Sequence, residues 1–296
     1  MRKVIFEESI NGITIDRIIR SYNYNMPSKH FHDEYEVYYL LEGERYYFIE
    51  QQSFYIKKGT LVLVNKEQIH KTSFVNTNYH HDRILIELKE EPFASFFSYM
   101  GDLNLQDFFK EHSGVIKLDE KGQRYVESHL YSIANEIHNK VVGYQMSVMM
   151  KLASLFIFIM RFKPNEISDN TINKTTTLRH QKVDKIASYI INNYADNISL
   201  ESIANHFYIS KCYLSRIFKE VTGFTVNEYI NIHRIKEAQE LLLNSDYSIT
   251  EISKIVGYES ISYFEKVFKK YTETSPLKYR KQNIKTTIPI RMKKTE

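Results

Sequence analysis

The first part of the chain alternates between short apolar runs and polar breaks. Five runs rich in Tyr, Val, Ile and Phe follow one another between Glu34 and Leu88: YEVYYLL, RYYFIE, SFYI, TLVLV and RILIEL. Glu-Gly, Gln-Gln and Lys-Lys-Gly breaks and an Asn-containing stretch separate them. β-Branched and aromatic runs of this length between turn residues are typical of antiparallel strands. The pattern therefore predicts an antiparallel β sandwich or barrel.

From about Gly122 the apolar positions change to a helical spacing. Residues 122–139 and 144–162 carry apolar side chains three and four positions apart, which predicts two amphipathic helices. The apolar residues exceed what one narrow stripe against the barrel needs; they include Val126, Leu130, Ile133, Ile137, Met149, Leu152, Phe156 and Ile159. Two interpretations stay open, because these helices could join two copies of the chain or only cover the sheet.

A polar stretch without periodicity, residues 163–179, follows and is typical of a connector. Beyond it, residues 180–282 have a helical pattern almost throughout, and this region contains a repeat. Five residues of the first copy recur fifty positions later: Ser210, Leu214, Phe218, Lys219 and Tyr229 correspond to Ser260, Phe264, Phe268, Lys269 and Tyr279. Each copy predicts a short helix, a tight turn and a longer helix that begins after a serine suited to the N-cap.

Helix, short turn and helix is the arrangement of the helix-turn-helix motif, whose second helix enters the major groove of DNA. In each copy this helix has an apolar side and a polar side. We expect the polar sides, with the two capping serines, to contact DNA; they are Ser210, Lys211, Cys212, Ser215, Arg216 and Lys219, and Ser260, Ile261, Ser262, Glu265, Lys266 and Lys269. A helical pattern from Val226 to Asn244, about 28 Å long at 1.5 Å per residue, joins the copies.

Charge and composition agree with a partner that is a polyanion. Residues 180–296 hold 18 Lys and Arg against 13 Asp and Glu, whereas residues 1–179 hold 22 against 23.

The single cysteine, Cys212, excludes an intrachain disulfide and a Cys-rich zinc site. The start of the chain does not have the pattern of a signal peptide, and the most apolar stretch, 148–162, is too short to span a bilayer. We therefore expect a cytoplasmic protein with no membrane contact.

The C-terminal region resembles the DNA-binding domain of AraC/XylS-type regulators over residues 180–282. The matching positions are Leu200, Ile203, Ala204, Ser210, Leu214, Ser215, Phe218, Lys219 and Gly223 in the first copy, and Ile252, Gly257, Tyr258, Tyr263, Phe264, Phe268, Lys269, Ser275, Pro276, Tyr279 and Arg280 in the second. The resemblance implies a homodimeric regulator, not an enzyme, that binds double-stranded promoter DNA and contacts RNA polymerase. It places base contacts at Cys212, Ser215 and Arg216 in the first copy and at Ile261, Ser262, Glu265 and Lys266 in the second, and Arg216 suits a guanine best. Glu273 stands where the family usually has glycine, so we expect local strain there.

A second resemblance concerns the N-terminal region. The segment from His30 to Gly43 fits the cupin pattern HxHxxxE(x)6G, and Gly59 and His70 fall where a second cupin motif has its glycine and histidine. Strand alternation puts His30, His32, Glu36, Tyr38 and Leu40 on one face, which we expect to point inward. The candidate effector-binding residues are His30, His32, Glu36, Tyr38 and His70. We favour an effector pocket with neither metal nor cofactor. The alternatives are a metal-dependent cupin enzyme with an accessory helical domain, and an architectural DNA binder without an effector.

The sequence thus predicts an α+β protein, in which an antiparallel jelly roll with two helices precedes an all-α domain with two helix-turn-helix motifs and a linker helix. We place an effector-binding and dimerisation domain at 1–165, a linker at 166–179, a DNA-binding domain at 180–284 and a basic tail at 285–296. His80 and His81, with Asp82, are interpreted as a solvated turn. The predicted function is ligand-responsive transcription regulation.

Overall fold

The computed structural model describes residues 1–22, 34–66, 68–76, 79–98, 104–162 and 176–284. Contacts divide the chain into two compact units. The first consists of Met1–Asp184 with Val221–Gly223, and the second of Lys185–Glu220 with Phe224–Glu296. The domain limits expected from the sequence stay predictions.

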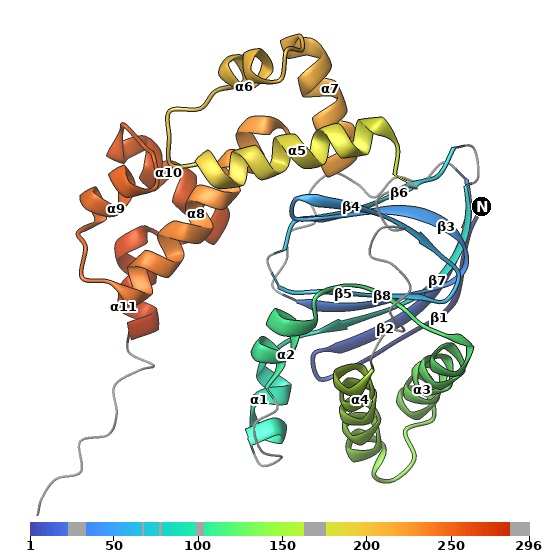
Figure 1. Ribbon diagram of the computed structural model, residues 1–296. Helices are drawn as coiled ribbons and strands as arrows, with labels where there is room; N and C mark the ends of the chain where they lie inside the picture. The colour runs from blue at the N-terminus through green and yellow to red at the C-terminus, as the bar shows by residue number, and fades with distance from the viewer. Residues whose placement is uncertain (23–33, 67, 77–78, 99–103, 163–175, 285–296) are drawn as a thin grey trace, which may run out of the picture. The chain divides into compact units, whose positions relative to one another are not determined.

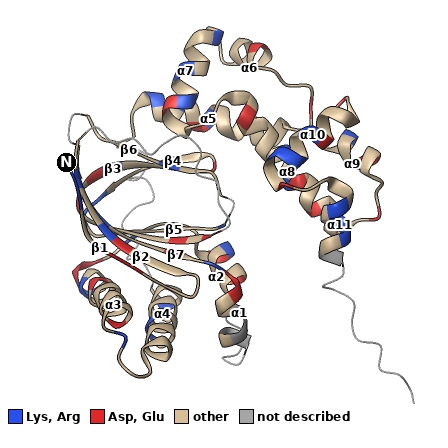
Figure 2. Ribbon diagram, turned by 180° about the vertical axis from the view of Figure 1, so that it is seen from behind, with Lys and Arg blue, Asp and Glu red and all other residues tan. Residues whose placement is uncertain are grey.

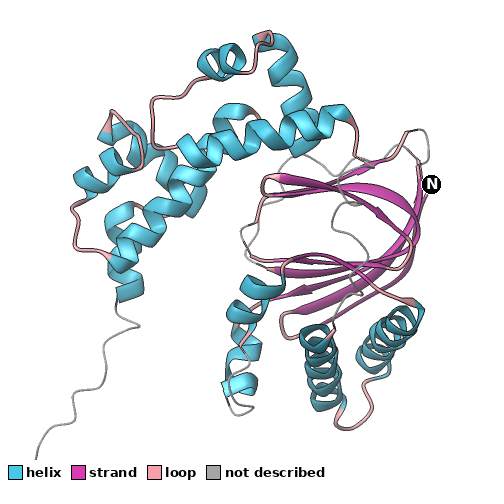
Figure 3. Cartoon of the chain, viewed as in Figure 1, coloured by secondary structure: helices cyan, strands magenta, loops and turns pink. Residues whose placement is uncertain are grey.

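Antiparallel strands in two layers build the first unit (Figures 1 and 3). The strands are β1 (Arg2–Ile10), β2 (Ile13–Ser21), β3 (Tyr35–Ile49), β4 (Gln52–Lys57), β5 (Thr60–Val64), β6 (His70–Phe74), β7 (His80–Leu88) and β8 (Gly114–Lys117). The larger layer has the order β1-β2-β7-β3-β5-β8, and the smaller layer forms where β4 and β6 pair with β3. The long strand β3 therefore belongs to both layers.

Four helices cover the outer face of the larger layer (Figure 1). They are α1 (Glu91–Ser98), α2 (Leu105–His112), α3 (Glu120–Asn139) and α4 (Tyr144–Arg161). The main core lies between them and the sheet, and a second cluster, which we call the inner core, lies between the two layers; it contains Tyr38, Leu40, Tyr47, Ile49, Ile56, Val62 and Val64. The predicted helices 122–139 and 144–162 are confirmed as α3 and α4. Their apolar residues cited from the sequence mainly cover the sheet, because all but the partly buried Met149 are buried.

One predicted turn is wrong. The Glu-Gly break at residues 42–43 lies inside β3, where a register shift between Leu40 and Glu42 marks a bulge. Gly43 has φ +91°, and a Cβ on it would lie 2.3 Å from the carbonyl oxygen of His80. Glycine is therefore needed here for the bulge and for the close approach of β7, and not for a turn between two strands.

The sequence patterns missed β1, β2, β6, β8, α1 and α2. The hairpin between β1 and β2 could have been predicted from the sequence, because Asn11-Gly12 separates two runs in which polar and apolar residues alternate. Both residues have positive φ, 39° for Asn11 and 79° for Gly12. This is the conformation of a two-residue type I′ hairpin turn, for which Asn-Gly is the favoured pair.

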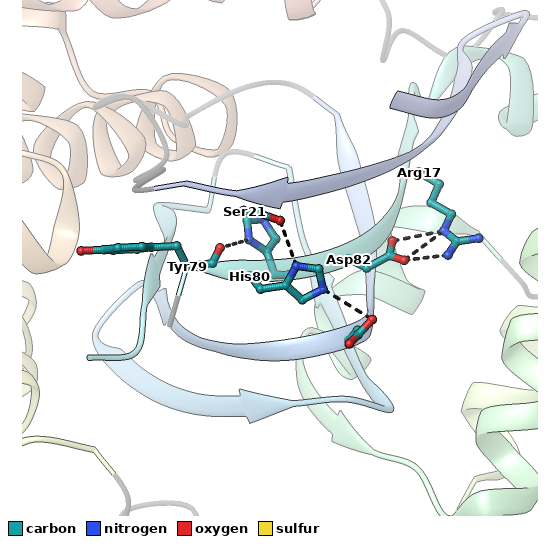
Figure 4. A network of polar contacts seen from close by, with 7 residues as sticks. Arg17, Ser21, Tyr79, His80 and Asp82 are labelled. Atoms are coloured by element: carbon teal, nitrogen blue, oxygen red, sulfur yellow. Dashed lines mark hydrogen bonds and ion pairs between the residues drawn. The ribbon is translucent and has the colours of Figure 1, made fainter. Parts of the chain in front are cut away.

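His80, His81 and Asp82 form no solvated turn but belong to β7 (Figure 4). His81 and Asp82 are 2% and 3% exposed. Pairing with β2 brings Asp82 close to Arg17, whose Nη2 donates to Asp82 Oδ2 at 2.6 Å. Ser21 Oγ and His80 Nδ1 are 3.0 Å apart. From the sequence alone, two adjacent histidines are expected to be exposed because they are polar. Their burial depends instead on the strands that pair with β7.

The second unit is helical (Figure 3). Its helices are the C-terminal part of α5 (Leu178–Asn193), then α6 (Leu200–His206), α7 (Lys211–Thr222), α8 (Val226–Asn244), α9 (Ile249–Ile255), α10 (Ile261–Thr272) and α11 (Pro276–Ile284). The predicted caps are confirmed, since Ser210 Oγ accepts from Tyr213 N at 3.2 Å and Ser260 Oγ accepts from Tyr263 N at 3.3 Å. Together the units confirm the predicted α+β fold class.

Two residues other than glycine adopt left-handed backbone in the second unit. Glu273 ends α10 with φ +62°, as expected from its place before Ser275-Pro276. Tyr208, in the turn of the first motif, has φ +54°, whereas Gly257 in the second turn has φ +89°. A Cβ on Gly257 would lie 2.4 Å from the carbonyl oxygen of Ala195, so this turn has no room for a side chain. The first turn is open, and the Tyr208 side chain is 95% exposed.

Among the described residues, the helices are all too short or too polar to cross a membrane.

Candidate nucleic-acid interface and ligand site

Helix α7 packs one side into the second unit and exposes the other. Leu214, Ile217 and Phe218 are at most 1% exposed. The predicted contact residues lie on the opposite side: Lys211, Cys212, Arg216 and Lys219 are exposed and Ser215 is half-buried. With Leu200 and Glu220 they line a shallow surface groove of about 750 Å³. The exposed side therefore offers short polar and cationic groups to a partner, as base-edge readout requires.

Helix α10 repeats this arrangement in the second motif. Phe264, Val267 and Phe268 are buried against α8, α9 and α11, whereas Tyr263 is 52% exposed. The predicted contact residues Ile261, Ser262, Glu265, Lys266 and Lys269 are all exposed. Figure 2 shows the Lys and Arg residues of α7 and α10. Phe218–Tyr229 and Phe268–Tyr279 are equivalent ring contacts, at 5.2 and 5.6 Å, so the sequence repeat corresponds to a repeat in packing.

One arginine of the linker helix α8 ties the two motifs together. Arg234 Nε donates to the carbonyl oxygen of Tyr194 at 2.7 Å, and its Nη2 donates to that of Asp196 at 2.9 Å. These carbonyls follow the C-terminus of α5. The same guanidinium lies 5.1 Å from the ring centre of Tyr258, in the turn of the second motif. Arg280 of α11 similarly donates to the carbonyl oxygen of Leu242, in the last turn of α8, and to that of Tyr247, in the loop after it. Contacts within the second unit therefore set the separation between the exposed side of α7 and the exposed side of α10.

The candidate effector residues divide between described and undescribed parts of the chain. His30 and His32 lie outside the described residues. Glu36, Tyr38 and His70 are 1%, 5% and 2% exposed, and the His70 Nε2 atom is 3.3 Å from Glu36 Oε1. Burial is the largest influence on Tyr38 and raises the pKa of its phenol. Among the residues described, no three His, Cys, Asp or Glu side chains are grouped closely enough to hold a metal ion.

Three buried arginines face inward between the layers, and the sequence analysis did not single them out. Arg20 of β2, Arg45 of β3 and Arg83 of β7 are 7%, 1% and 7% exposed; we call them the inward arginine cluster. Register puts each on the inward face, because Arg45 pairs with Ile56 and Arg83 with Leu40, both of the inner core, and Arg20 pairs with His81, two positions from Arg83.

A carboxylate and a neutral imidazole lie beside the cluster. Arg83 Nη2 donates to Asp16 Oδ2 at 3.2 Å, and Arg83 Nη1 also contacts Asp16 Oδ1. Burial, together with the positive charges of Arg45, Arg20 and Arg83, lowers the pKa of His81 to about 3. The imidazole is therefore neutral at pH 7. Local sequence patterns do not indicate this cluster, because β2 was missed and inward charges break the alternation expected of a strand.

Comparison with known proteins agrees with this division of the chain. The model of an AraC-like ligand-binding domain matches residues 13–90, and that of a helix-turn-helix domain matches residues 203–282. Together they cover more than half of the chain.

Full-length similarity extends to curated regulators. The melibiose operon regulatory protein of Escherichia coli is 26% identical over 275 residues, which are 89% of this chain and 87% of that protein. The Msm operon regulatory protein of Streptococcus mutans is 25% identical over 94% of both chains. Regulatory protein PocR of Salmonella typhimurium is 34% identical over 124 residues, and the match spans only 41% of its length.

The chain therefore belongs to the AraC family of transcription regulators, with an AraC-like ligand-binding domain followed by a DNA-binding helix-turn-helix domain. The hypothesis of a metal-dependent cupin enzyme is wrong, because this family consists of regulators and not of enzymes.

Proposed function

We propose that this regulator reads specific promoter sequences with α7 and α10 and that a small-molecule effector bound between its β layers changes its promoter affinity. The observation that carries the proposal is the paired packing of the two helices. α7 buries four apolar residues and α10 buries three, and each helix exposes a row of polar and cationic residues, with Arg216 and Lys266 both solvent-accessible. Phosphate contacts position such a protein on DNA, whereas side chains in the groove supply sequence specificity.

The relatives support the regulatory part of the proposal. Two of them, similar over most of both chains, are described as operon regulatory proteins. The AraC-like ligand-binding domain supports an effector, whose binding must favour one promoter-binding state over another. Contact with RNA polymerase stays a prediction of the resemblance.

Arg216 is the first residue to test. Its side chain is exposed on α7, with the guanidinium carbon 5.7 Å from the ring centre of Tyr213. Arg216→Ala removes a fork that can bond to guanine O6 and N7, so we expect specific binding to weaken by about 1–3 kcal/mol and one base position to lose its preference. Genome-wide footprinting supplies the target sites, and binding to a library of site variants measures both effects.

A matched control separates base reading from charge. Arg124, on α3 of the first unit, has a side chain that is 72% exposed. Arg124→Ala removes the same charge from a helix outside both helix-turn-helix motifs and should leave base preference unchanged. If Arg216→Ala and Arg124→Ala have the same affinities and preferences, Arg216 reads no base.

We further infer that α4 joins two copies of the chain. Four of its apolar side chains are exposed, namely Met146 at 59%, Met150 at 55%, Ile157 at 39% and Met160 at 49%. With the half-buried Ala153 they follow the 4-3-4-3 spacing of a coiled-coil seam. The opposite side of α4 is buried in the main core. A self-complementary seam of this kind fits a second copy of the same helix.

A charge in this seam should separate the copies. Met150→Lys would bring two ammonium groups together in a contact without counter-charges, so we expect dimerisation to weaken by about 3 kcal/mol or more, over a hundredfold in Kd. Sedimentation of the full chain across a concentration series measures this Kd. Gln145→Lys adds the same charge at an exposed position beside the seam and should change the Kd little. Equal dissociation constants for the two variants would exclude the seam as the interface.

A further inference from the structure

The turn between α6 and α7 carries an exposed tyrosine where the second motif has glycine (Figure 1). Helices α6 and α9 end in the same backbone conformation, since Phe207 has φ −94° and ψ 6° and Val256 has φ −84° and ψ 8°. The residues that follow, Tyr208 and Gly257, both have positive φ, at 54° and 89°. The two turns therefore begin alike, and Tyr208 stands at the position of Gly257.

This backbone conformation is unfavourable for tyrosine. The left-handed residue after a helix is usually glycine, because a Cβ there lies too close to the following carbonyl oxygen. The Tyr208 side chain is 95% exposed, so packing does not offset the cost. The turn is held by its backbone, in which Tyr208 N donates to Asn205 O at 3.1 Å and Ile209 N donates to Ala204 O at 3.0 Å. A strained residue that gains no packing within its own domain is typical of a site that contacts a partner.

Aromatic rings fix the position of this turn. The His206 ring stacks on that of Tyr189 with ring centres 4.2 Å apart, and the Phe207 ring is 5.7 Å from Tyr189. Tyr189 is in the C-terminal part of α5 and belongs to the same unit. Tyr208 therefore extends from an ordered turn, so that a contact through its side chain does not have to order the loop first.

The chain around Tyr208 carries positive charge and no negative charge. Residues 202–219 contain Lys211, Arg216 and Lys219 but no Asp or Glu. The corresponding residues of the second motif, 251–269, contain three glutamates and three lysines. The first motif therefore suits a polyanion better than the second does.

Tyr208 is also close in the chain to the residues proposed to read bases. It lies two residues before Ser210, the N-cap of α7, and three before Lys211. In this motif the N-terminal residues of the second helix contact base edges. Three residues span at most about 11 Å, which is less than the width of the major groove, about 12 Å. When Lys211 reaches the groove, Tyr208 is therefore near the phosphates that border it.

The chemistry of tyrosine fits such a phosphate. Its hydroxyl is a neutral hydrogen-bond donor, and tyrosine is among the side chains that bond to phosphate oxygens of DNA. Resting on the DNA reading proposed above, we propose that the Tyr208 hydroxyl donates to a phosphate of the promoter backbone beside the groove that α7 reads. The contact positions α7 and has no base preference. Because the hydroxyl is neutral, the contact does not add to the salt dependence of binding.

Removing the hydroxyl alone tests this contact. Tyr208→Phe in the full chain should weaken binding about 3- to 10-fold, the usual net contribution of one hydrogen bond. The factor should be the same for every member of a library of variants of a footprinted promoter, and the slope of affinity against salt should equal that of the parent chain. Tyr247→Phe removes the hydroxyl of another tyrosine of this unit, 48% exposed between α8 and α9, and should bind as the parent chain does.

Tyr208→Gly separates the contact from folding. Glycine adopts left-handed backbone without strain, so the amides of α6 and α7 should exchange hydrogen no faster than in the parent chain. The same variant should weaken DNA binding at least as much as Tyr208→Phe. Faster exchange in Tyr208→Gly would show that the side chain stabilises the turn, which would overturn the proposal.

The DNA measurements give distinct outcomes. If both Tyr208 variants bind the library as the parent chain does, the proposal is wrong, and a loss of transcription with purified RNA polymerase would then assign Tyr208 to a protein contact. Loss of preference at one base after Tyr208→Phe would also overturn it, because the hydroxyl then reads a base. Weaker binding by Tyr208→Gly alone would mean that the ring, and not the hydroxyl, makes the contact.

These outcomes are separable from the failure of base reading. Uniform weakening by Tyr208→Phe, together with unchanged binding and base preference after Arg216→Ala, would keep the phosphate contact and remove Arg216 from the base-reading residues. If the variants at both positions bind the library as the parent chain does, the phosphate contact and base reading by Arg216 both fail.

Discussion

Replacing Gly43 with alanine should lower the free energy of unfolding of the first unit by about 2–4 kcal/mol. At φ +91° a side chain costs about 1 kcal/mol in backbone strain alone. The new Cβ would also lie 2.3 Å from the carbonyl oxygen of His80 and 3.0 Å from the Cα of His81. Both atoms belong to the backbone of β7, so neither can rotate away, and separating the strands adds about 1–3 kcal/mol.

Gly143 is a matched control within the same unit. It has φ +82°, but no atom lies within 4 Å of an added Cβ. Gly143→Ala should therefore cost only the backbone strain, about 1 kcal/mol. Hydrogen exchange of β3 and β7 amides in the full chain measures the stability of this unit by itself. Equal losses for the two variants would show that β3 and β7 can part at the bulge without cost.

Asp16→Asn should destabilise the same unit by about 3 kcal/mol. The change keeps the shape of the side chain but removes the carboxylate that binds Arg83. Arg83 is 7% exposed, so its charge would be left in a poorly hydrated position. Removing one partner of a buried ion pair usually costs about 3–5 kcal/mol, and the lower end applies because the Asp16 side chain is 16% exposed.

An exposed ion pair of the first unit serves as the comparison. Lys66 Nζ is 2.6 Å from Glu90 Oε2, with side chains 29% and 40% exposed. Glu90→Gln should cost less than about 1 kcal/mol, because water screens and replaces the interaction. Urea unfolding combined with hydrogen exchange of β2 and β7 measures both variants. A loss after Asp16→Asn no larger than that after Glu90→Gln would mean that water reaches Arg83.

The helix-turn-helix half was predictable because its signals are local. Ser210 and Ser260 cap helices whose periodic apolar residues, such as Phe218 and Phe268, recur at a fixed offset. A helix satisfies its backbone within one segment, so spacing and caps indicate both its extent and its buried side. The residues proposed to contact DNA, among them Arg216 and Lys266, are accordingly exposed in the structure.

The β half was only partly predictable because its strands are defined by distant partners. The sequence pattern around Gly43 predicts two strands joined by a turn. Pairing with β7 shows instead that the segment is one strand with a bulge. His81 and Asp82 read as solvated, whereas pairing with β2 and β3 buries them. The sequence contained the Asn11-Gly12 signal for the first hairpin, but this hairpin decides the position of Arg20 only through its register with β7.

By itself, the sequence determined the α+β class, the paired helix-turn-helix motifs and the exposed face of each second helix, because these follow from periodicity and capping within short segments. Only the tertiary structure decided that Arg20, Arg45 and Arg83 are buried on the inward face of the strands, and that Met146, Met150, Ile157 and Met160 of α4 are exposed. Burial of a strand residue depends on which strand pairs beside it and which layer covers it. Those partners lie up to tens of residues away in the chain, beyond the reach of any local pattern.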